Sequence, residues 1–400
     1  MSHPYRPDVV LAPAWVAGRP ETIERLNGLL AEAGLGRPLS APPGSAPATT
    51  ELVELPVHGD PVAIARATRR LADRSDVPVC LPDYESTAAT VEDDARPEEH
   101  LYPYYQASGC KSGHGTVAWL PAPDYMMPPK PLRRPASQLP AGRPVVALLD
   151  TGVRKHDWLD EADGEPYWAD AEGWTPLRAI PKVAGQESHG AASENPDFGS
   201  HWGHGTFLAG LVRLAAPDAR ILSLRVMSDA GRVSDLNAAH ALNWLADRVH
   251  ADERVDVVLT AFGRRRIGDD DEEMEPVRKA LKRLADRGVP VVASAGNDGS
   301  DIPIYPAAFA VDPELTVVSV GAGASPTARA RYSNHGGWVR QWDQGTNAVS
   351  TMPLTTTPEN TTPDTGKGAF AYWSGTSFAA ARYAGRLAQG LVPPPVRLPE

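Results

Sequence analysis

From residue 145 onward, short apolar runs alternate with helical stretches, and this rhythm restricts the possible folds more than any other feature. The runs lie at 145–149, 221–226, 255–259, 291–293 and 316–320, and they are rich in valine and leucine. Strands that are apolar along nearly their whole length must be covered on both faces, which is typical of parallel sheets packed between helices. We therefore predict an α/β fold with a mainly parallel sheet and helices on both faces.

Two of the intervening helices have recognisable ends. The apolar residues between Leu236 and Val249 recur on one helical face, and Ser234 precedes them as a predicted N-cap. Pro276 and Gly288 bracket a second helix, in the positions where proline favours a helix start and glycine a helix end.

A second and smaller α/β pattern lies nearer the N-terminus. It predicts a strand at 9–11, a helix at 20–33, a strand at 51–57, a helix at 61–73 and a strand at 77–81. This succession predicts a small α+β domain of ferredoxin-like type. The 40 prolines of the chain crowd residues 37–47 and 121–144, where helices and central strands are hard to continue. We therefore expect three parts: a small domain at 1–84, a proline-rich linker at 85–142 and a larger domain at 143–400.

Composition limits the partners and the location. Hydrophobic residues make up 42% and charged residues 22%, as in a soluble globular protein, and the net charge of -11 argues against nucleic acid as a partner. The N-terminal residues lack the pattern of a signal peptide, and no apolar run approaches the roughly 18–20 residues that span a bilayer. We expect no membrane partner and a cytoplasmic location. Cys80 and Cys110 are the only cysteines, and two free thiols are favoured over one bridge, which stays open.

Polar residues that could take part in catalysis follow several of the predicted strands. Asp150 ends the run at 145–149, and the letters Gly-His-Gly-Thr occur twice, around His114 and around His204. Only the second copy leads into an apolar helical stretch, which places His204 at a helix start. His201 and His204 also allow a metal interpretation, but no third ligand accompanies them, and we favour none.

Ser377 and Asn297 are each ambiguous alone. Ser377 begins a helical run that ends near Gly390, so it is either an N-cap or a nucleophile near free backbone N–H groups. Asn297 follows a strand, so it is either a turn residue or an oxyanion donor. Their order along the chain, taken together with Asp150 and His204, favours the catalytic interpretation. Asp150, His204 and Ser377 occur in the chain order typical of the subtilisin class of serine proteases, with Asn297 between the histidine and the serine.

The surrounding letters also resemble that family. "ALLDTGVRKHDWL", "GHGTFLAGLV", "GVPVVASAGNDGS" and "YWSGTSFAAARYAG" are similar to its four signatures, and the resemblance spans about residues 143–392. It implies a serine endopeptidase with Ser377 as nucleophile, His204 as general base and Asp150 orienting the imidazole. The Asn297 amide and the Ser377 N–H would bind the oxyanion. His114 precedes the linker and is predicted to be incidental.

The resemblance further implies where a peptide would bind. An extended substrate would lie between Gly231, Arg232 and Val233 on one side and Ala261, Phe262 and Gly263 on the other. The side chain preceding the scissile bond (P1) would sit near Ala293, Ser294, Ala295 and Gly296. No cofactor is needed for this chemistry. Calcium is frequent in the family, but no acidic cluster here is assignable to it. Ala381, Ala261 and Phe207 depart from the family pattern, which affects the expected pocket shape more than the reacting groups.

Three further expectations follow. The N-terminal domain resembles, by pattern alone, the inhibitory propeptide of many subtilases, which implies intramolecular inhibition. Within the enzyme class, the alternative is a dedicated maturation protease acting on one precursor peptide. Outside that class, it is a non-catalytic module that binds peptides on the same fold.

Overall fold

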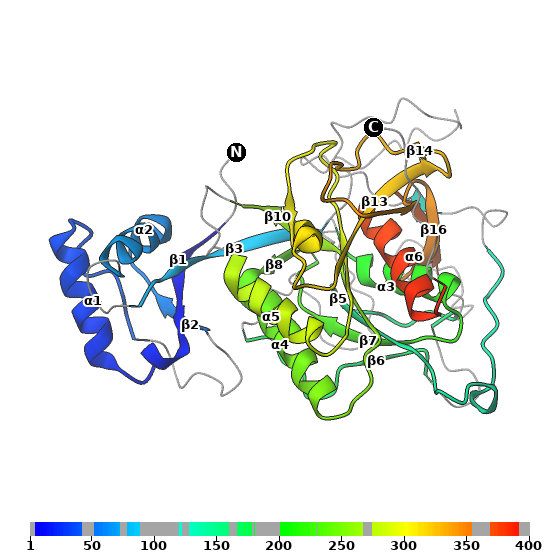
Figure 1. Cartoon of the computed structure of the whole chain (residues 1–400), viewed down its shortest axis with the longest axis horizontal. Coiled ribbons are helices and arrows are strands. Elements are labelled where there is room, and N and C mark those ends of the chain that lie inside the picture. The colour runs from blue at the N-terminus through cyan, green and yellow to red at the C-terminus, as the bar shows by residue number, and fades with distance from the viewer. Residues whose placement is uncertain are drawn as a thin grey trace, which may run out of the picture.

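The computed structural model describes residues 5–41, 52–72, 78–88, 120–121, 128–159, 166–177, 180, 201–229, 231–266, 274–353 and 369–391. Figure 1 shows a small N-terminal unit, drawn in blue, beside a larger C-terminal unit, with the strand β3 running from the first into the second. We call residues 5–88 the N-terminal unit and residues 128–391 the C-terminal unit.

The C-terminal unit is built on a mainly parallel sheet. Its strands follow the order β14-β13-β11-β9-β5-β7-β6, with β15 also paired to β13. Every pair is parallel except β13 with β14. The strands are β5 (Val145–Asp150), β6 (Trp168–Asp170), β7 (Arg220–Arg225), β9 (Val257–Thr260), β11 (Val291–Ser294), β13 (Val317–Ser325), β14 (Ala328–Arg329) and β15 (Gln341–Gln344). All five predicted strands are present, with ends shifted by a few residues.

Helices cover both faces of this sheet, as predicted. They are α3 (His204–Ala215), α4 (Asp235–His250), α5 (Glu275–Ala285) and α6 (Thr376–Ala388). One hydrophobic cluster joins α4 and α5 to one face, and a second joins α3 and α6 to the other. Ser234 is the N-cap of α4, and its hydroxyl accepts a hydrogen bond from Asn237 N at 3.2 Å. Gly288 has a φ of 72°, the left-handed conformation that suits glycine just past a helix end.

The N-terminal unit has the predicted order of elements. These are β1 (Tyr5–Pro13), α1 (Pro20–Glu32), β2 (Leu52–Pro56), α2 (Pro61–Ala72) and β3 (Leu81–Ala88). The strand β1 pairs antiparallel with both β2 and β3, and the helices contribute to a separate hydrophobic cluster on this small sheet. The ferredoxin-like description and the domain boundaries stay predictions.

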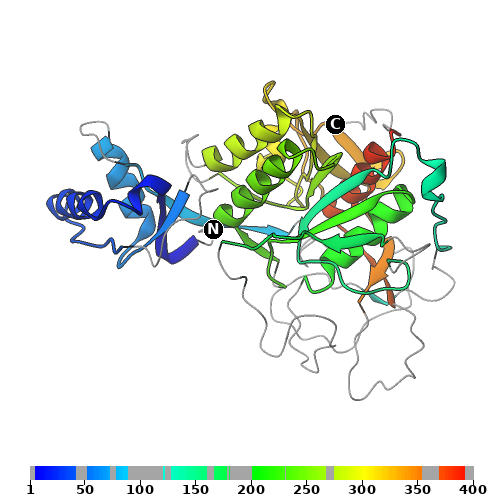
Figure 2. The ribbon, with the colours of Figure 1, turned by 90° about the horizontal axis from the view of Figure 1, so that it is seen from below.

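The last strand of this unit differs from the prediction. The apolar run at 77–81 was expected to be the strand, but β3 begins at Leu81 and continues past residue 84 to Ala88. The reason is its partners: β3 pairs antiparallel with β8 (Arg232–Ser234) and with β10 (Phe262–Arg265) of the C-terminal unit. Figures 1 and 2 both show this strand crossing between the two units.

Short strands complete the structure. The strand β10 also pairs with β12 (Ile304–Tyr305), and β17 (Ala369–Trp373) pairs with β16 (Ala348–Met352) and with β4 (Leu120–Pro121). The segment at 85–142, expected to be a linker, therefore contributes residues 85–88 and 120–121 to sheets. Among the described residues, no helix is both long and apolar enough to cross a membrane.

Candidate active site

Asp150 and His204 meet at the carboxyl edge of the parallel sheet. Asp150 is the last residue of β5, and His204 is the first residue of α3. His204 Nδ1 lies 2.9 Å from Oδ1 and 3.0 Å from Oδ2 of Asp150, and both side chains are fully buried. A buried carboxylate at Nδ1 fixes the orientation of the ring and stabilises a positive charge on it.

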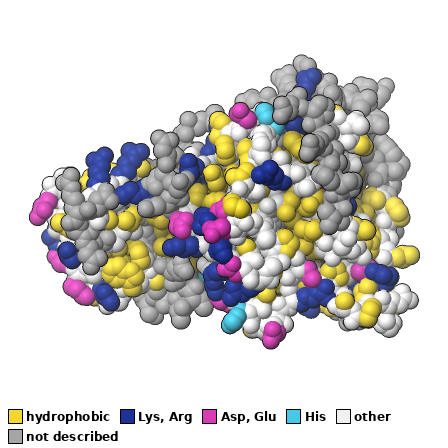
Figure 3. Space-filling view, viewed as in Figure 1, with side chains coloured by type: hydrophobic (Ala, Val, Ile, Leu, Met, Phe, Trp, Pro, Cys, Tyr) yellow, Lys and Arg dark blue, Asp and Glu magenta, His cyan; other side chains and the backbone are white. Residues whose placement is uncertain are grey.

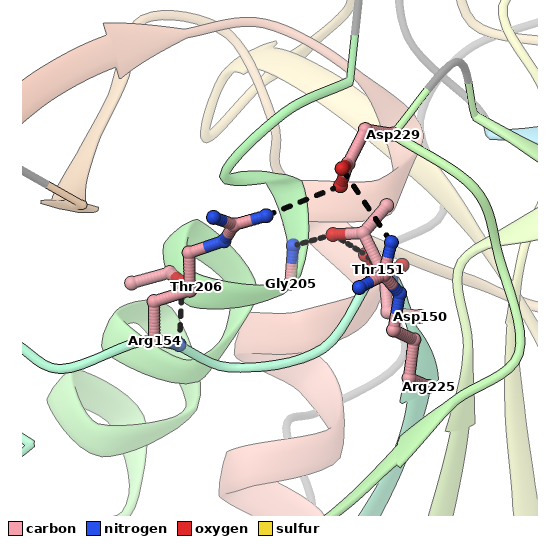
Figure 4. Close-up of polar contacts among 7 residues, drawn as sticks. All are labelled: Asp150, Thr151, Arg154, Gly205, Thr206, Arg225 and Asp229. Atoms are coloured by element: carbon pink, nitrogen blue, oxygen red, sulfur yellow. Dashed lines mark hydrogen bonds and ion pairs between the residues drawn. The ribbon is translucent and has the colours of Figure 1, made fainter. Parts of the chain in front are cut away.

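The loop after β5 holds the Asp150 carboxylate in place, as Figure 4 shows. Thr151 donates from its backbone N (2.8 Å) and its hydroxyl (3.2 Å) to Asp150 Oδ1, and Gly205 N donates to the same hydroxyl at 3.0 Å. The start of α3 must approach closely, because a Cβ on Gly205 would lie 2.4 Å from the Gly152 carbonyl oxygen. The glycine after the histidine is therefore required by packing.

Asp229 anchors a second set of contacts in the same region (Figure 4). Its carboxylate is fully buried and accepts from Arg154 at 3.4 Å and from Arg225 at 3.5 Å. Arg154 N donates to Thr206 Oγ1 at 3.0 Å, and the Arg154 guanidinium lies 5.2 Å from the centre of the Trp202 ring. These contacts join the loop after β5, the start of α3 and the segment before β8.

Ser377 is the second residue of α6, behind the N-cap Gly375. At this position backbone N–H groups lack partners within the helix, and the helix dipole favours negative charge. The Ser377 hydroxyl donates to the Ala261 carbonyl oxygen at 3.1 Å, whereas His204 Nε2 has no hydrogen-bond partner among the described residues. The His204 ring packs 5.7 Å from the ring of Phe378, the residue after the serine.

Asn297 is held with its amide nitrogen free for a partner. Its Oδ1 accepts from Thr376 N at 2.9 Å, and Thr376 Oγ1 accepts from Gly296 N at 3.0 Å. Asn297 Nδ2 is buried and has no hydrogen-bond partner among the described residues. An orphaned buried donor beside a helix N-terminus is suited to stabilise an oxyanion.

Sequence reasoning missed the role of aromatic packing around His204. Trp373 and Phe378 lie within 5.7 Å of its ring, and Phe207 packs on both of them. Phe207, which departs from the pattern of the family that the sequence resembles, is thus part of this aromatic cluster. His201 also packs on the His204 ring, at 5.7 Å.

His201 packs against the His204 ring but carries no charge. Burial lowers the pKa of His201 to about 3, with a smaller effect from His204, so it stays neutral at physiological pH. A Cβ on Gly231 would lie 2.4 Å from its Nδ1. No local signal in the sequence predicts this contact, because it depends on a close approach between residues thirty positions apart.

The segments predicted to bind substrate surround β3. Thr87 is paired with Arg232 of β8 and with Gly263 of β10, and Ala88 is paired with Phe262. Ala293 and Ala295 are fully buried and belong to the cluster under α4 and α5, so their side chains point away from the solvent. The strand β3 therefore occupies the position where an extended peptide was expected.

The remaining candidates from the sequence are His114, the two cysteines and a metal site. His114 and Cys110 are outside the described residues, so the pairing of Cys110 with Cys80 stays open. Cys80 is buried, and burial raises the pKa of its thiol to about 12. The described residues contain no group of three or more His, Cys, Asp or Glu side chains able to hold a metal, and we assign no calcium site.

Comparison with known proteins decides the family. Residues 142–391 match the Subtilase family (Peptidase S8). The chain belongs to this family. Among similar proteins, the thermophilic serine proteinase of Bacillus sp. (strain AK1) is 30% identical over 46% of this chain and 41% of its own length. The extracellular protease of Xanthomonas campestris pv. campestris is 28% identical over 61% of this chain and 43% of its own. Subtilisin BL of Lederbergia lenta is 25% identical over 61% of this chain and 74% of its own.

The chain thus spans less than half the length of the first two of these relatives. A solved structure of a cold-adapted subtilisin-like serine proteinase covers 62% of this chain at 20% identity and a TM-score of 0.43. At that score, the description of the fold rests on the strand order and helix placement of the chain itself.

Proposed function

We propose that this subtilase is a serine endopeptidase with an Asp150-His204-Ser377 triad. The observation that carries the proposal is the buried Asp150–His204 pair next to a helix N-terminus that holds Ser377. The partnerless Asn297 amide nitrogen lies at the same helix start and supports it further. The combination suits acyl transfer, because it supplies a nucleophile, a base, an orienting carboxylate and an oxyanion donor.

In the proposed reaction, Ser377 Oγ leaves the Ala261 carbonyl and attacks the carbonyl carbon of the substrate. Its proton passes to His204 Nε2, while Nδ1–H donates to Asp150. The resulting oxyanion accepts hydrogen bonds from Asn297 Nδ2 and Ser377 N. His204 then gives the proton to the leaving amine. A water attacks the acyl-enzyme and gives a proton to His204, which passes it to Ser377 Oγ as the bond to the acyl group breaks and the carboxylic acid product leaves. No step requires a cofactor.

We also propose that the N-terminal unit inhibits this site in cis. The support is β3, which fills the space between β8 and β10 and would exclude a substrate strand from both. From its N-terminal to its C-terminal end, β3 runs along β10 towards Ala261, whose carbonyl oxygen accepts a hydrogen bond from Ser377. A chain running in this direction presents itself as a substrate would, by strand addition.

This arrangement gives a test of inhibition in cis. Intact-mass measurement during storage should reveal a cut just C-terminal to Ala88 in the wild-type chain and none in Ser377→Ala. A wild-type chain that hydrolyses added peptides at full rate while residues 1–88 stay attached and docked would rule the inhibitor role out.

Two alternatives remain distinguishable by experiment. A non-catalytic peptide-binding module would not react with a fluorophosphonate probe at Ser377, whereas the proposed enzyme should form one covalent adduct there. A dedicated maturation protease would cleave one precursor and spare most peptides of a library. The cytoplasmic location stays a prediction, and the Xanthomonas relative is extracellular by its name.

A further inference from the structure

Two segments, which we call the two walls, lie next to Ser377, and each contacts the start of α6. On one side, Ser377 Oγ donates to the Ala261 carbonyl just before β10. On the other side, Gly296 N donates to Thr376 Oγ1 at 3.0 Å. The resemblance to subtilases implies that a peptide residue reaching Ser377 along β10 places its side chain between the segment at 261–263 and the segment at 293–297.

The side chain of Ile304 stands between these two walls. Ile304 begins β12, which pairs with β10 in the register Arg265 to Ile304. A Cβ added to Gly263 would lie 2.5 Å from Ile304 Cγ2, and a Cβ added to Gly296 would lie 3.2 Å from Ile304 Cγ1. Ile304 thus contacts one glycine of each wall, and it occupies space that both glycines leave open.

Ile304 cannot easily move aside. It is 6% exposed and belongs to the hydrophobic cluster under α4 and α5. Its branched Cβ restricts rotation about the first side-chain bond, so a swing would require the neighbours to repack. Asn334 also lies against Gly296, because a Cβ added to that glycine would lie 2.5 Å from Asn334 Nδ2.

We propose that Ile304 restricts the substrate residue on the acyl side of the scissile bond to glycine, alanine or serine. This specificity rests on the proposed endopeptidase function and deepens it. The chain's own sequence agrees, because β3 ends at Ala88 and the next residue along the chain, Ala89, is also alanine.

The test uses the full chain and three blocked tetrapeptide anilides that differ only in the last residue: alanine, leucine or phenylalanine. Because each methylene in a tight apolar pocket changes kcat/KM by about 10- to 200-fold, wild type should prefer alanine over phenylalanine by at least about 100-fold. In Ile304→Ala, kcat/KM for the phenylalanine peptide divided by kcat/KM for the alanine peptide should rise by at least about tenfold.

Two further variants serve as controls. Ile302, two residues earlier and 46% exposed, gives the matched variant Ile302→Ala, whose ratio should equal that of wild type. If Ile304→Ala melts below the assay temperature, Ile304→Val removes one methyl group and should raise the leucine-to-alanine ratio instead.

A wild-type preference for phenylalanine, or an unchanged ratio in a folded Ile304 variant, would overturn the assignment of Ile304 alone. If wild type, after the chain has been cut behind residue 88 so that β3 can leave the site, cleaves none of the three peptides and forms no fluorophosphonate adduct, the proposed function fails and the proposed specificity fails with it.

Discussion

Asn297 shows how a backbone group can aim a side chain at a site. Thr376 N–H donates to Oδ1 of Asn297, and this bond turns Nδ2 away from the helix start, where it is buried without a partner. The sequence could predict Asn297, Asp150, His204 and Ser377, because each lies in a recognisable motif. It could not predict His201 or Ile304, whose roles depend on close approaches to Gly231, Gly263 and Gly296.

Replacing Asn297 should affect the transition state more than substrate binding. In Asn297→Ala we expect kcat to fall by about 10²–10³ with little change in KM, because the amide binds a charge that exists only during reaction. The magnitude is that of the corresponding donor in a related subtilisin rather than a property of this chain. Steady-state kinetics on one peptide check it, and a change confined to KM would reassign Asn297 to substrate binding.

The two Gly-His-Gly-Thr copies provide a matched pair of variants. His204→Ala should remove hydrolysis almost completely, because it deletes the group that contacts Asp150. His114→Ala changes the same four letters elsewhere and should retain the wild-type kcat/KM. Comparable losses in both variants would mean that the base has been assigned to the wrong histidine.

At the scale of elements, β3 is the part of the fold that the sequence predicts least well. The apolar run at 77–81 favoured a strand, but the ladder forms along polar residues that follow it. Strand propensity describes how a segment suits a half-buried surface, and here that surface is supplied by β8 and β10. By contrast, α4 and α5 were predictable because their start and end signals are local.

Buried charges accompany β3 where it leaves the N-terminal unit. Asp83 is fully buried, accepts from Arg6 at 3.0 Å, and has a second oxygen without a hydrogen-bond partner among the described residues. Glu54 of β2 contacts the same arginine, and Asp235 of α4 faces Asp83 while pairing with Arg264 of β10 at 2.6 Å. Figure 3 shows basic and acidic side chains gathered where the two units meet.

Docking of β3 should therefore weaken as pH rises. Burial, and next the charge of Asp235, raise the pKa of Asp83 to about 7, while Arg6 opposes this. The docked state then holds a proton that an undocked carboxyl, with a pKa of about 4, has lost. The proton-linked stabilisation of docking is complete below about pH 4 and is lost as pH rises through 7. Over this range the equilibrium constant for docking falls by at most about tenfold per pH unit.

The measurement compares hydrolysis by the full wild-type chain with that by Asp83→Asn from pH 5 to 8. The ratio cancels every pH effect that the two proteins share, and it should rise several-fold in favour of wild type towards pH 8, because asparagine cannot ionise. Asp8→Asn is the control, since that side chain is 61% exposed and contacts the same arginine. A flat ratio for Asp83→Asn would contradict the linkage.

At the scale of the whole molecule, the rhythm of apolar runs was sufficient to predict the parallel sheet and its two helical layers. The path of the chain between the units was not predictable. The pairings of β3 with β8 and β10, and of β4 with β17, join residues well over a hundred positions apart. Such pairings depend on the surface of the folded C-terminal unit, so no local sequence pattern predicts them.

The central claim is that Ser377 is the nucleophile of an endopeptidase. The most direct test incubates a mixed peptide library at pH 8 with the wild-type chain and with Ser377→Ala, and reads the products by mass spectrometry. We expect internal cuts with wild type and none with Ser377→Ala, while both proteins share one thermal melt, because the substitution removes a single hydroxyl at a helix start. Cleavage by Ser377→Ala at the wild-type rate would contradict the account.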